Sequence, residues 1–356
     1  MALHTVKDID GLKQHIYAAL QLEHATLPPY LTALYSLHPG TNTEAFHVIR
    51  TVAVEEMLHL TLAANLMNAV GGKVDLTAPG FVPQYPAYLP DGEEDFQVDC
   101  AGFSRSTIET FLKIERPAEL IEGAPRTVNR TGREGTVHAS WVDKDGEEHF
   151  HSIGEFYKAI ALGLEHLHKE HGDALFCGDP ARQITSDYYY SGGGEIIAVT
   201  DLESALAAID LIGEQGEGVT NHIFDEEGEI AHYYRFQQLL LGRFYREGDE
   251  PNAPTGGVLE VDWDAAYPIR KNARLSDYPE GSAIRAQAEA FDRRYAEFLK
   301  FLTAAFDGKP EMFIPAIGGM FELKELFAQL IRQPLDDEGT LFAAPAFDIE
   351  TALGRT

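Results

Sequence analysis

Cysteine, basic side chains and long apolar runs are all scarce in this chain of 356 residues. The two cysteines, Cys100 and Cys177, lie far apart and in no CxxC pattern, which argues against a disulfide framework or a thiolate metal site. The 28 basic side chains are outnumbered by 57 acidic ones, which gives a net charge of −29. Nucleic acid and anionic membrane surfaces need the opposite sign, so neither is expected as a partner.

Targeting and membrane signals are also missing. The first residues contain neither the basic nor the apolar region of a signal peptide. No apolar run approaches the roughly 20 residues that a membrane-spanning helix needs. We therefore expect a cytoplasmic protein with no membrane contact, whose 44% apolar residues suffice for a sizeable core.

Two long helices are predicted at the start of the chain. Apolar residues recur at three- and four-residue intervals over residues 8–37, with an interruption at Pro28-Pro29 where we expect a kink or short break. A second helix is expected over residues 41–70. The turn between them is short, so the two helices must lie antiparallel.

Two more bundle helices are predicted further along, at about 153–171 and 227–246. The segment 72–151 forms a long crossover with short β elements, and Asp145-Gly146 is its hairpin turn signal. The segment 172–226 is a second insertion, with a β-like run and a helical stretch.

These elements predict a mainly α fold, a four-helix bundle with one long crossover. The bundle is expected to occupy residues 1–250. Residues 251–356 are expected to form a C-terminal extension packed on it, with helices at about 281–307 and 310–333.

The sharpest chemical signal is the spacing Glu-x-x-His. Residues three apart share one face of a helix, so both side chains can reach one metal ion. Di-iron carboxylate bundles use such a pair on two helices and a lone glutamate on each of the other two. The spacing occurs five times: Glu44/His47, Glu56/His59, Glu148/His151, Glu165/His168 and Glu229/His232.

Two of the five pairs, Glu56/His59 and Glu229/His232, lie on otherwise apolar helix faces. A glutamate and a histidine there are costly to bury unless they are paired or bound to metal. For either pair alone, an ion pair or a satisfied polar group in the core is an equally good interpretation. The two pairs together favour a metal centre.

The single glutamate ligands expected from the first and third helices can be chosen by their positions along those helices. If the first turn centres between Pro39 and Gly40, Glu23 and Glu56 lie equally far from it and therefore at the same level. Glu23 is thus the expected ligand from the first helix. In the third helix Glu155 lies on an apolar face, and we choose it over the other glutamates there.

Four segments resemble the ferritin-like domain of iminophenylpyruvate dimer synthase, an enzyme of violacein- and rebeccamycin-type pigment pathways. They are LQLEHATLPPYLTALYSL (20–37), VEEMLHLTLAANLMNAVGG (54–72), SIGEFYKAI (152–160) and GEIAHYYRFQQLL (228–240). The resemblance covers most of this chain, although the pigment enzyme is much longer. It implies a ferritin-like bundle with metal ligands at Glu23, Glu56, His59, Glu155, Glu229 and His232. It does not carry over the reaction.

We therefore predict a ferritin-like protein that holds two iron ions, with manganese or a mixed pair as alternatives, since carboxylate and imidazole ligands suit either metal. The predicted function is a non-haem di-iron oxidase or oxygenase of a natural-product-type pathway, with dioxygen and a small, amino-acid-derived substrate as partners. Its catalytic residues would be the metal ligands Glu23, Glu56, His59, Glu229 and His232. The rivals are an iron-oxidising or iron-sequestering protein without an organic substrate, and a metal-free structural protein. Homo-oligomer formation is left open.

Overall fold

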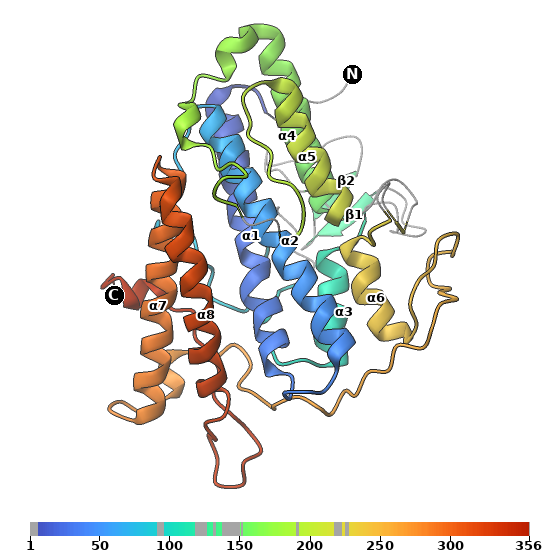
Figure 1. Ribbon diagram of the computed structural model, residues 1–356, viewed down its shortest axis with the longest axis vertical. Coiled ribbons are helices and arrows are strands. Elements are labelled where there is room, and N and C mark those ends of the chain that lie inside the picture. The colour runs from blue at the N-terminus through green and yellow to red at the C-terminus, as the bar shows by residue number, and fades with distance from the viewer. Residues whose placement is uncertain are drawn as a thin grey trace.

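The computed structural model describes residues 6–90, 96–117, 127–130, 133–136, 150, 152–189, 192–216, 223–224 and 228–355. Its centre is a pair of long helices, α1 (Ile9–Ser36) and α2 (Thr43–Ala69), which lie side by side and antiparallel as predicted (Figure 1). Apolar side chains of these two helices, such as Ile16, Leu20 and Val52, are fully buried in the core. Each stabilises the fold by about 1.5–3 kcal/mol through burial.

Two short helix pairs cover one face of the α1–α2 pair. The first pair is α4 (Ile153–His171) with α5 (Leu202–Gly216), and the second is α3 (Arg105–Ile114) with α6 (His232–Leu241). Figure 1 shows the two pairs one after the other along α1 and α2. The bundle is therefore completed by two helix pairs placed end to end, where we had predicted two single helices, and α4 has the bounds predicted for the first of these, 153–171.

The boundaries predicted for the fourth helix, residues 227 and 246, are both wrong, because α6 spans His232–Leu241. Ala231 is extended, because its backbone N–H donates to the carbonyl of Ile223 at 3.3 Å, and the helix begins only at His232. It ends at Gly242, whose φ of 68° lies in the left-handed region that glycine tolerates. The resulting α6 is long enough to pack against α3 through the rings of Phe236 and Phe111, whose centroids are 5.2 Å apart.

The expected break at the prolines is also absent, because α1 runs unbroken through Pro28 and Pro29. Pro29 has no N–H to donate to the carbonyl four residues earlier, that of Ala25. The hydroxyl of Tyr85 donates to that carbonyl instead, at 2.7 Å. A side chain from the crossover therefore supplies the hydrogen bond that the proline removes.

Strands are a minor part of the described chain. β1 (Thr127–Arg130) and β2 (Arg133–Thr136) pair antiparallel, with Thr127 opposite Thr136. The predicted turn at Asp145-Gly146 lies outside the described residues. The β-like run at 195–200 forms no strand, because side chains satisfy its backbone: Gln183, for example, accepts from the N–H of Val199 at 2.9 Å.

The C-terminal extension packs on the other face of the α1–α2 pair, as Figure 1 shows. Its main helices are α7 (Ala283–Phe306) and α8 (Phe313–Leu330), close to the two predicted segments. Short helices complete the described part: η2 (Gly172–Leu175), η3 (Pro180–Arg182), η4 (Leu275–Asp277), η5 (Pro310–Met312) and α9 (Ile349–Ala352). None of the described helices is both long and apolar enough to cross a membrane.

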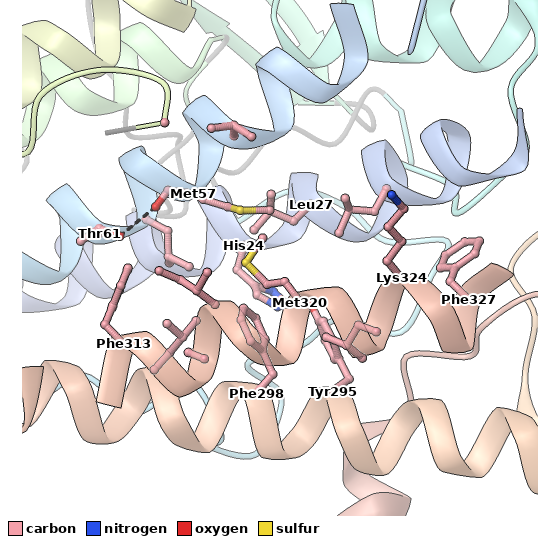
Figure 2. Close-up of a pocket in the computed structure, with 18 of the residues that line it drawn as sticks. His24, Leu27, Met57, Thr61, Tyr295, Phe298, Phe313, Met320, Lys324 and Phe327 are labelled. Atoms are coloured by element: carbon pink, nitrogen blue, oxygen red, sulfur yellow. Dashed lines mark hydrogen bonds between the residues drawn. The ribbon is translucent and has the colours of Figure 1, made fainter. Parts of the chain in front are cut away.

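A cavity of about 290 Å³ lies between the α1–α2 pair and the α7–α8 pair (Figure 2). His24 and Met57 line it from α1 and α2, and Phe298 and Met320 line it from α7 and α8. His24 and Met57 each follow directly after a predicted metal ligand in the sequence. The long helices thus present one face to this cavity and another to the four short helices.

Candidate metal centre

Four of the six predicted ligands, Glu23, Glu56, His59 and His232, meet where the two short helix pairs adjoin. Tyr157 lies in the first turns of α4 and Gln215 in the last turn of α5. Glu115 directly follows α3, and His232 is the first residue of α6. Four helix ends therefore surround one region of α1 and α2, and each contributes a polar side chain to it.

Glu23, Glu56 and His59 form a first group of possible ligands, whose ligand atoms lie within 4.8 Å of one another. All three are at most 3% exposed. His59 Nδ1 lies 3.5 Å from Glu23 Oε2 and 3.5 Å from Glu56 Oε1. The other oxygen of each carboxylate accepts a hydroxyl hydrogen bond, from Tyr157 to Glu23 and from Thr26 to Glu56. The level match predicted for Glu23 and Glu56 is confirmed.

Glu56, Glu115 and His232 form the second group, also fully buried. His232 Nδ1 lies 3.1 Å from Glu56 Oε1 and 3.4 Å from Glu115 Oε2. The other oxygen of Glu115 accepts a hydrogen bond from the hydroxyl of Tyr30. Glu56 belongs to both groups, so its Oε1 is the atom that joins them.

The first histidine is fixed from behind by an amide. His59 Nε2 lies 2.9 Å from the side-chain oxygen of Gln215, and the amide nitrogen of Gln215 donates to the carbonyl of Gly193 at 2.6 Å. That second bond orients the amide so that its oxygen faces the imidazole. An acceptor there holds a proton on Nε2, so Nδ1 is the nitrogen that faces the carboxylates and that could bind a metal ion once its own proton is released.

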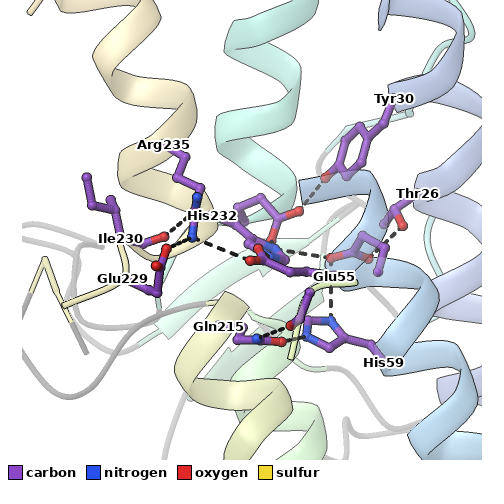
Figure 3. Close-up of polar contacts among 12 residues, drawn as sticks. Thr26, Tyr30, Glu55, His59, Gln215, Glu229, Ile230, His232 and Arg235 are labelled. Carbon is purple, nitrogen blue, oxygen red and sulfur yellow. Dashed lines mark hydrogen bonds and ion pairs between the residues drawn. The ribbon is translucent and has the colours of Figure 1, made fainter. Parts of the chain in front are cut away.

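The second histidine is fixed by a chain of charges (Figure 3). His232 Nε2 lies 2.8 Å from Glu55 Oε2, and Arg235 lies 3.4 Å from the other oxygen of Glu55. Arg235 also pairs with Glu229 at 2.9 Å. A carboxylate behind a metal-binding histidine is a recurrent arrangement, because it holds the proton on the nitrogen that faces away from the metal.

The structure does not bring Glu229 and Glu155 into either group of described residues. Glu229 precedes α6, so it does not share a helix face with His232, and its side chain is 67% exposed. Glu155 lies in the first turn of α4, where Ser152 caps its backbone N–H at 3.1 Å. Instead, α4 contributes Tyr157 to the centre.

Glu115 was missed by the sequence interpretation. It lies outside any Glu-x-x-His pair and within the proline-rich crossover. One signal was available: Glu115 follows the buried Ile108 and Phe111 at helical spacing, so it continues the apolar stripe of α3. A glutamate on such a stripe needs a partner, as at the other candidate positions.

Five residues form one cluster of interacting charges, here named the five-residue cluster: Glu23, Glu56, His59, Glu115 and His232. Burial and the charge of Glu56 raise the pKa of Glu23 to about 7, and the same two causes raise the pKa of Glu115. Burial alone would raise the pKa of Glu56, but its contacts with the two histidines lower it. The carboxylates likewise raise the pKa of His59 to about 10, against the effect of burial. Without a cation the cluster must retain protons, so metal binding is expected to release them.

The donors of the five-residue cluster fit a pair of metal ions. His232 Nδ1 is buried and has no hydrogen-bond partner in the described part of the chain, although two carboxylate oxygens lie close to it. Three carboxylates and two imidazoles are the ligand types that iron and manganese accept. A buried nitrogen that faces two carboxylate oxygens has the geometry of a metal ligand.

A cleft of about 570 Å³ reaches the back of the cluster. Glu55 and Gln215, the two residues that fix the histidines, both line it. The cleft therefore lies directly behind the two residues that fix the histidines.

Replacing Gln215 with leucine is expected to weaken metal binding at the His59 side by about 10–100-fold, because the imidazole loses the acceptor that fixes its orientation and tautomer. Gln215→Glu keeps an acceptor for Nε2 and should keep the affinity. Titration against a competing chelator measures both variants. Equal affinity in the leucine variant and the wild type would contradict this role.

Known proteins resemble this chain in sequence and in fold. A family model described as ferritin-like matches residues 16–241. Dichlorochromopyrrolate synthase from Lentzea aerocolonigenes is 26% identical over 291 residues, which covers 73% of this chain and 25% of that protein. The chain thus spans about a quarter of the length of that relative. The crystal structure of a ferritin-like protein from Caulobacter vibrioides matches with a TM-score of 0.61 and 24% identity, over 91% of this chain and 95% of that one, which shows a shared fold.

Proposed function

This chain belongs to the ferritin-like family, and we propose that it is a non-haem di-iron oxidase or oxygenase that acts on a small organic substrate. One observation carries the proposal. Each member of the five-residue cluster has one polar atom held by a neighbour outside the cluster and another directed into it. Such preorganisation is what a metal centre requires and what an ordinary buried ion pair does not need.

The proposed ligands are Glu23, Glu56, His59, Glu115 and His232, with Glu56 shared between two iron ions, or between manganese ions or a mixed pair. When bound, the metal supplies the electrons that reduce dioxygen. The chain orients the ligands through hydroxyl and amide hydrogen bonds, and it keeps bulk water away because all five side chains are at most 3% exposed.

An organic substrate is supported by two observations. A cleft lies beside the cluster and is roomy enough for a small molecule. The similarity to dichlorochromopyrrolate synthase also favours an organic substrate, because that relative is named for an organic product. We propose a small, amino-acid-derived substrate of a natural-product-type pathway, with dioxygen as the second reactant. A cytoplasmic location remains a prediction from the sequence.

Oxygen uptake tests the proposal. The protein, loaded with ferrous iron without air, is exposed to dioxygen with and without aromatic 2-imino acids, and products are analysed by mass spectrometry. We expect substrate-dependent uptake that falls roughly 100-fold or more in the double variant Glu56→Ala/His59→Ala, since the metal supplies the electrons.

The matched control is Glu44→Ala/His47→Ala, which removes the same residue types at the same spacing from the exposed part of the same helix. It should keep full activity. Rapid oxidation of ferrous iron alone, with assembly into a hollow shell and no organic product, would instead favour the iron-sequestering rival.

A further inference from the structure

The cavity between the α1–α2 and α7–α8 pairs has the composition of a ligand site. It lies on the face of α1 and α2 opposite the five-residue cluster, so the metal centre does not account for it. Aromatic side chains dominate its walls, among them Tyr35, Phe291, Tyr295, Phe298, Phe313 and Phe327. Binding sites for small molecules are typically apolar and aromatic in this way, with few polar groups.

The volume of the cavity limits the size of the ligand. An apolar cavity of about 150 Å³ is enough to bind one benzene ring. The present cavity measures about 290 Å³, so it has room for about two aromatic rings. The aromatic walls provide edge and face contacts for them.

Two cationic side chains mark one end of the cavity. Figure 2 shows Lys324 and Phe327 at the end away from Thr61 and Phe313. Arg50 belongs to the same end, because its charge acts on Tyr35, whose ring lies 5.3 Å from that of Phe327.

Neither Lys324 nor Arg50 forms an ion pair with another residue in the described part of the chain. Both side chains line the cavity and are also exposed to solvent. The two free cations favour an anionic ligand group at this end of the cavity.

A third polar group lies between the two ends. His24 is 1% exposed, and its Nε2 lies 2.7 Å from the hydroxyl of Tyr295. Its Nδ1 has no hydrogen-bond partner among the described residues. A buried polar atom of this kind has a cost unless something bonds to it, and a ligand inside the cavity would provide that bond.

We propose that this cavity binds an aromatic carboxylic acid of one or two rings. The rings lie among the aromatic side chains, and the carboxylate lies at Lys324 and Arg50. The site does not depend on the proposed oxidase function. It adjoins the cleft of the metal centre, however, because Arg50, Val54 and Gly192 line both spaces.

Calorimetric titration with 2-naphthylacetate tests the proposal on the full chain, in metal-free and in metal-loaded form. We expect binding in both forms. The uncharged amide of the same compound should bind at least about 10-fold more weakly, because it offers no charge to the two cations. Lys324→Gln and Arg50→Gln should each weaken binding of the acid by roughly 3–10-fold, while Lys300→Gln, an exposed lysine of α7 outside the cavity, should not.

Filling the space provides a second test. Met320 is half-buried and points into the cavity in Figure 2, so Met320→Trp should abolish binding while circular dichroism and metal content stay unchanged. Equal affinity for the acid and its amide, undiminished binding to the tryptophan variant, or no binding to the wild type would each overturn the proposal. Metal content is measured separately, so such a failure would leave the oxidase proposal standing, and loss of metal would leave this one standing.

Discussion

Glu56→Ala is expected to abolish binding of both metal ions, and no other single substitution in the cluster should have so large an effect. Glu56 is the residue common to the two ligand groups, and its Oε1 lies within 3.5 Å of the Nδ1 atoms of both histidines. Metal content, measured by plasma emission spectrometry after anaerobic loading, should fall from about two ions per chain to nearly none.

The variant should remain folded, so that metal loss reports on binding alone. In the metal-free protein the charge of Glu56 raises the pKa values of Glu23 and Glu115, which means that it repels them. Its removal relieves that repulsion, and His59 and His232 keep Glu23 and Glu115 as carboxylate partners. Thr26 is not left unbonded, because its hydroxyl also donates to the carbonyl of Glu23 at 2.9 Å. Glu44→Ala on the same helix serves as the control, and retention of two ions by Glu56→Ala would refute the shared-ligand geometry.

Five of the helices could be predicted because their signals are local. In α1, α2, α4, α7 and α8 the apolar period persists over many residues, and a short turn fixes the pairing of α1 with α2. The positions of Glu23, Glu56 and His59 follow from that pairing alone. This half of the site thus depends on only two neighbouring elements, and the sequence was sufficient to place it.

The other half depends on contacts between distant segments. Whether Glu229 shares a face with His232 depends on where α6 begins, and that is set by the backbone hydrogen bond between Ala231 and Ile223. Glu115 reaches His232 only because α3, from the crossover, packs against α6. Such tertiary pairings leave no periodic pattern in a single sequence, so the Glu-x-x-His motif alone could not place Glu115 in the candidate site.

Arg235 connects Glu229 to the five-residue cluster although Glu229 itself lies outside it. Its guanidinium lies between Glu229 and Glu55, and Glu55 in turn fixes His232. Three residues, Arg235, Glu55 and His232, therefore link Glu229 to the proposed metal centre. Because it is largely exposed, its pairing with Arg235 is expected to contribute at most about 1 kcal/mol.

Glu115→Gln and Glu229→Gln are therefore expected to differ sharply. The first change neutralises a buried carboxylate 3.4 Å from His232 Nδ1 while keeping its shape, so the protein should lose about one of two ions, the one on the His232 side. The second change affects an exposed partner of Arg235, so both ions should stay. Metal content and competitive chelator titration of the two variants, side by side, give the measurement. If Glu229→Gln lost the ion and Glu115→Gln kept it, the Glu-x-x-His spacing would describe the bound state, and α6 would have to begin at least one turn earlier when metal is present.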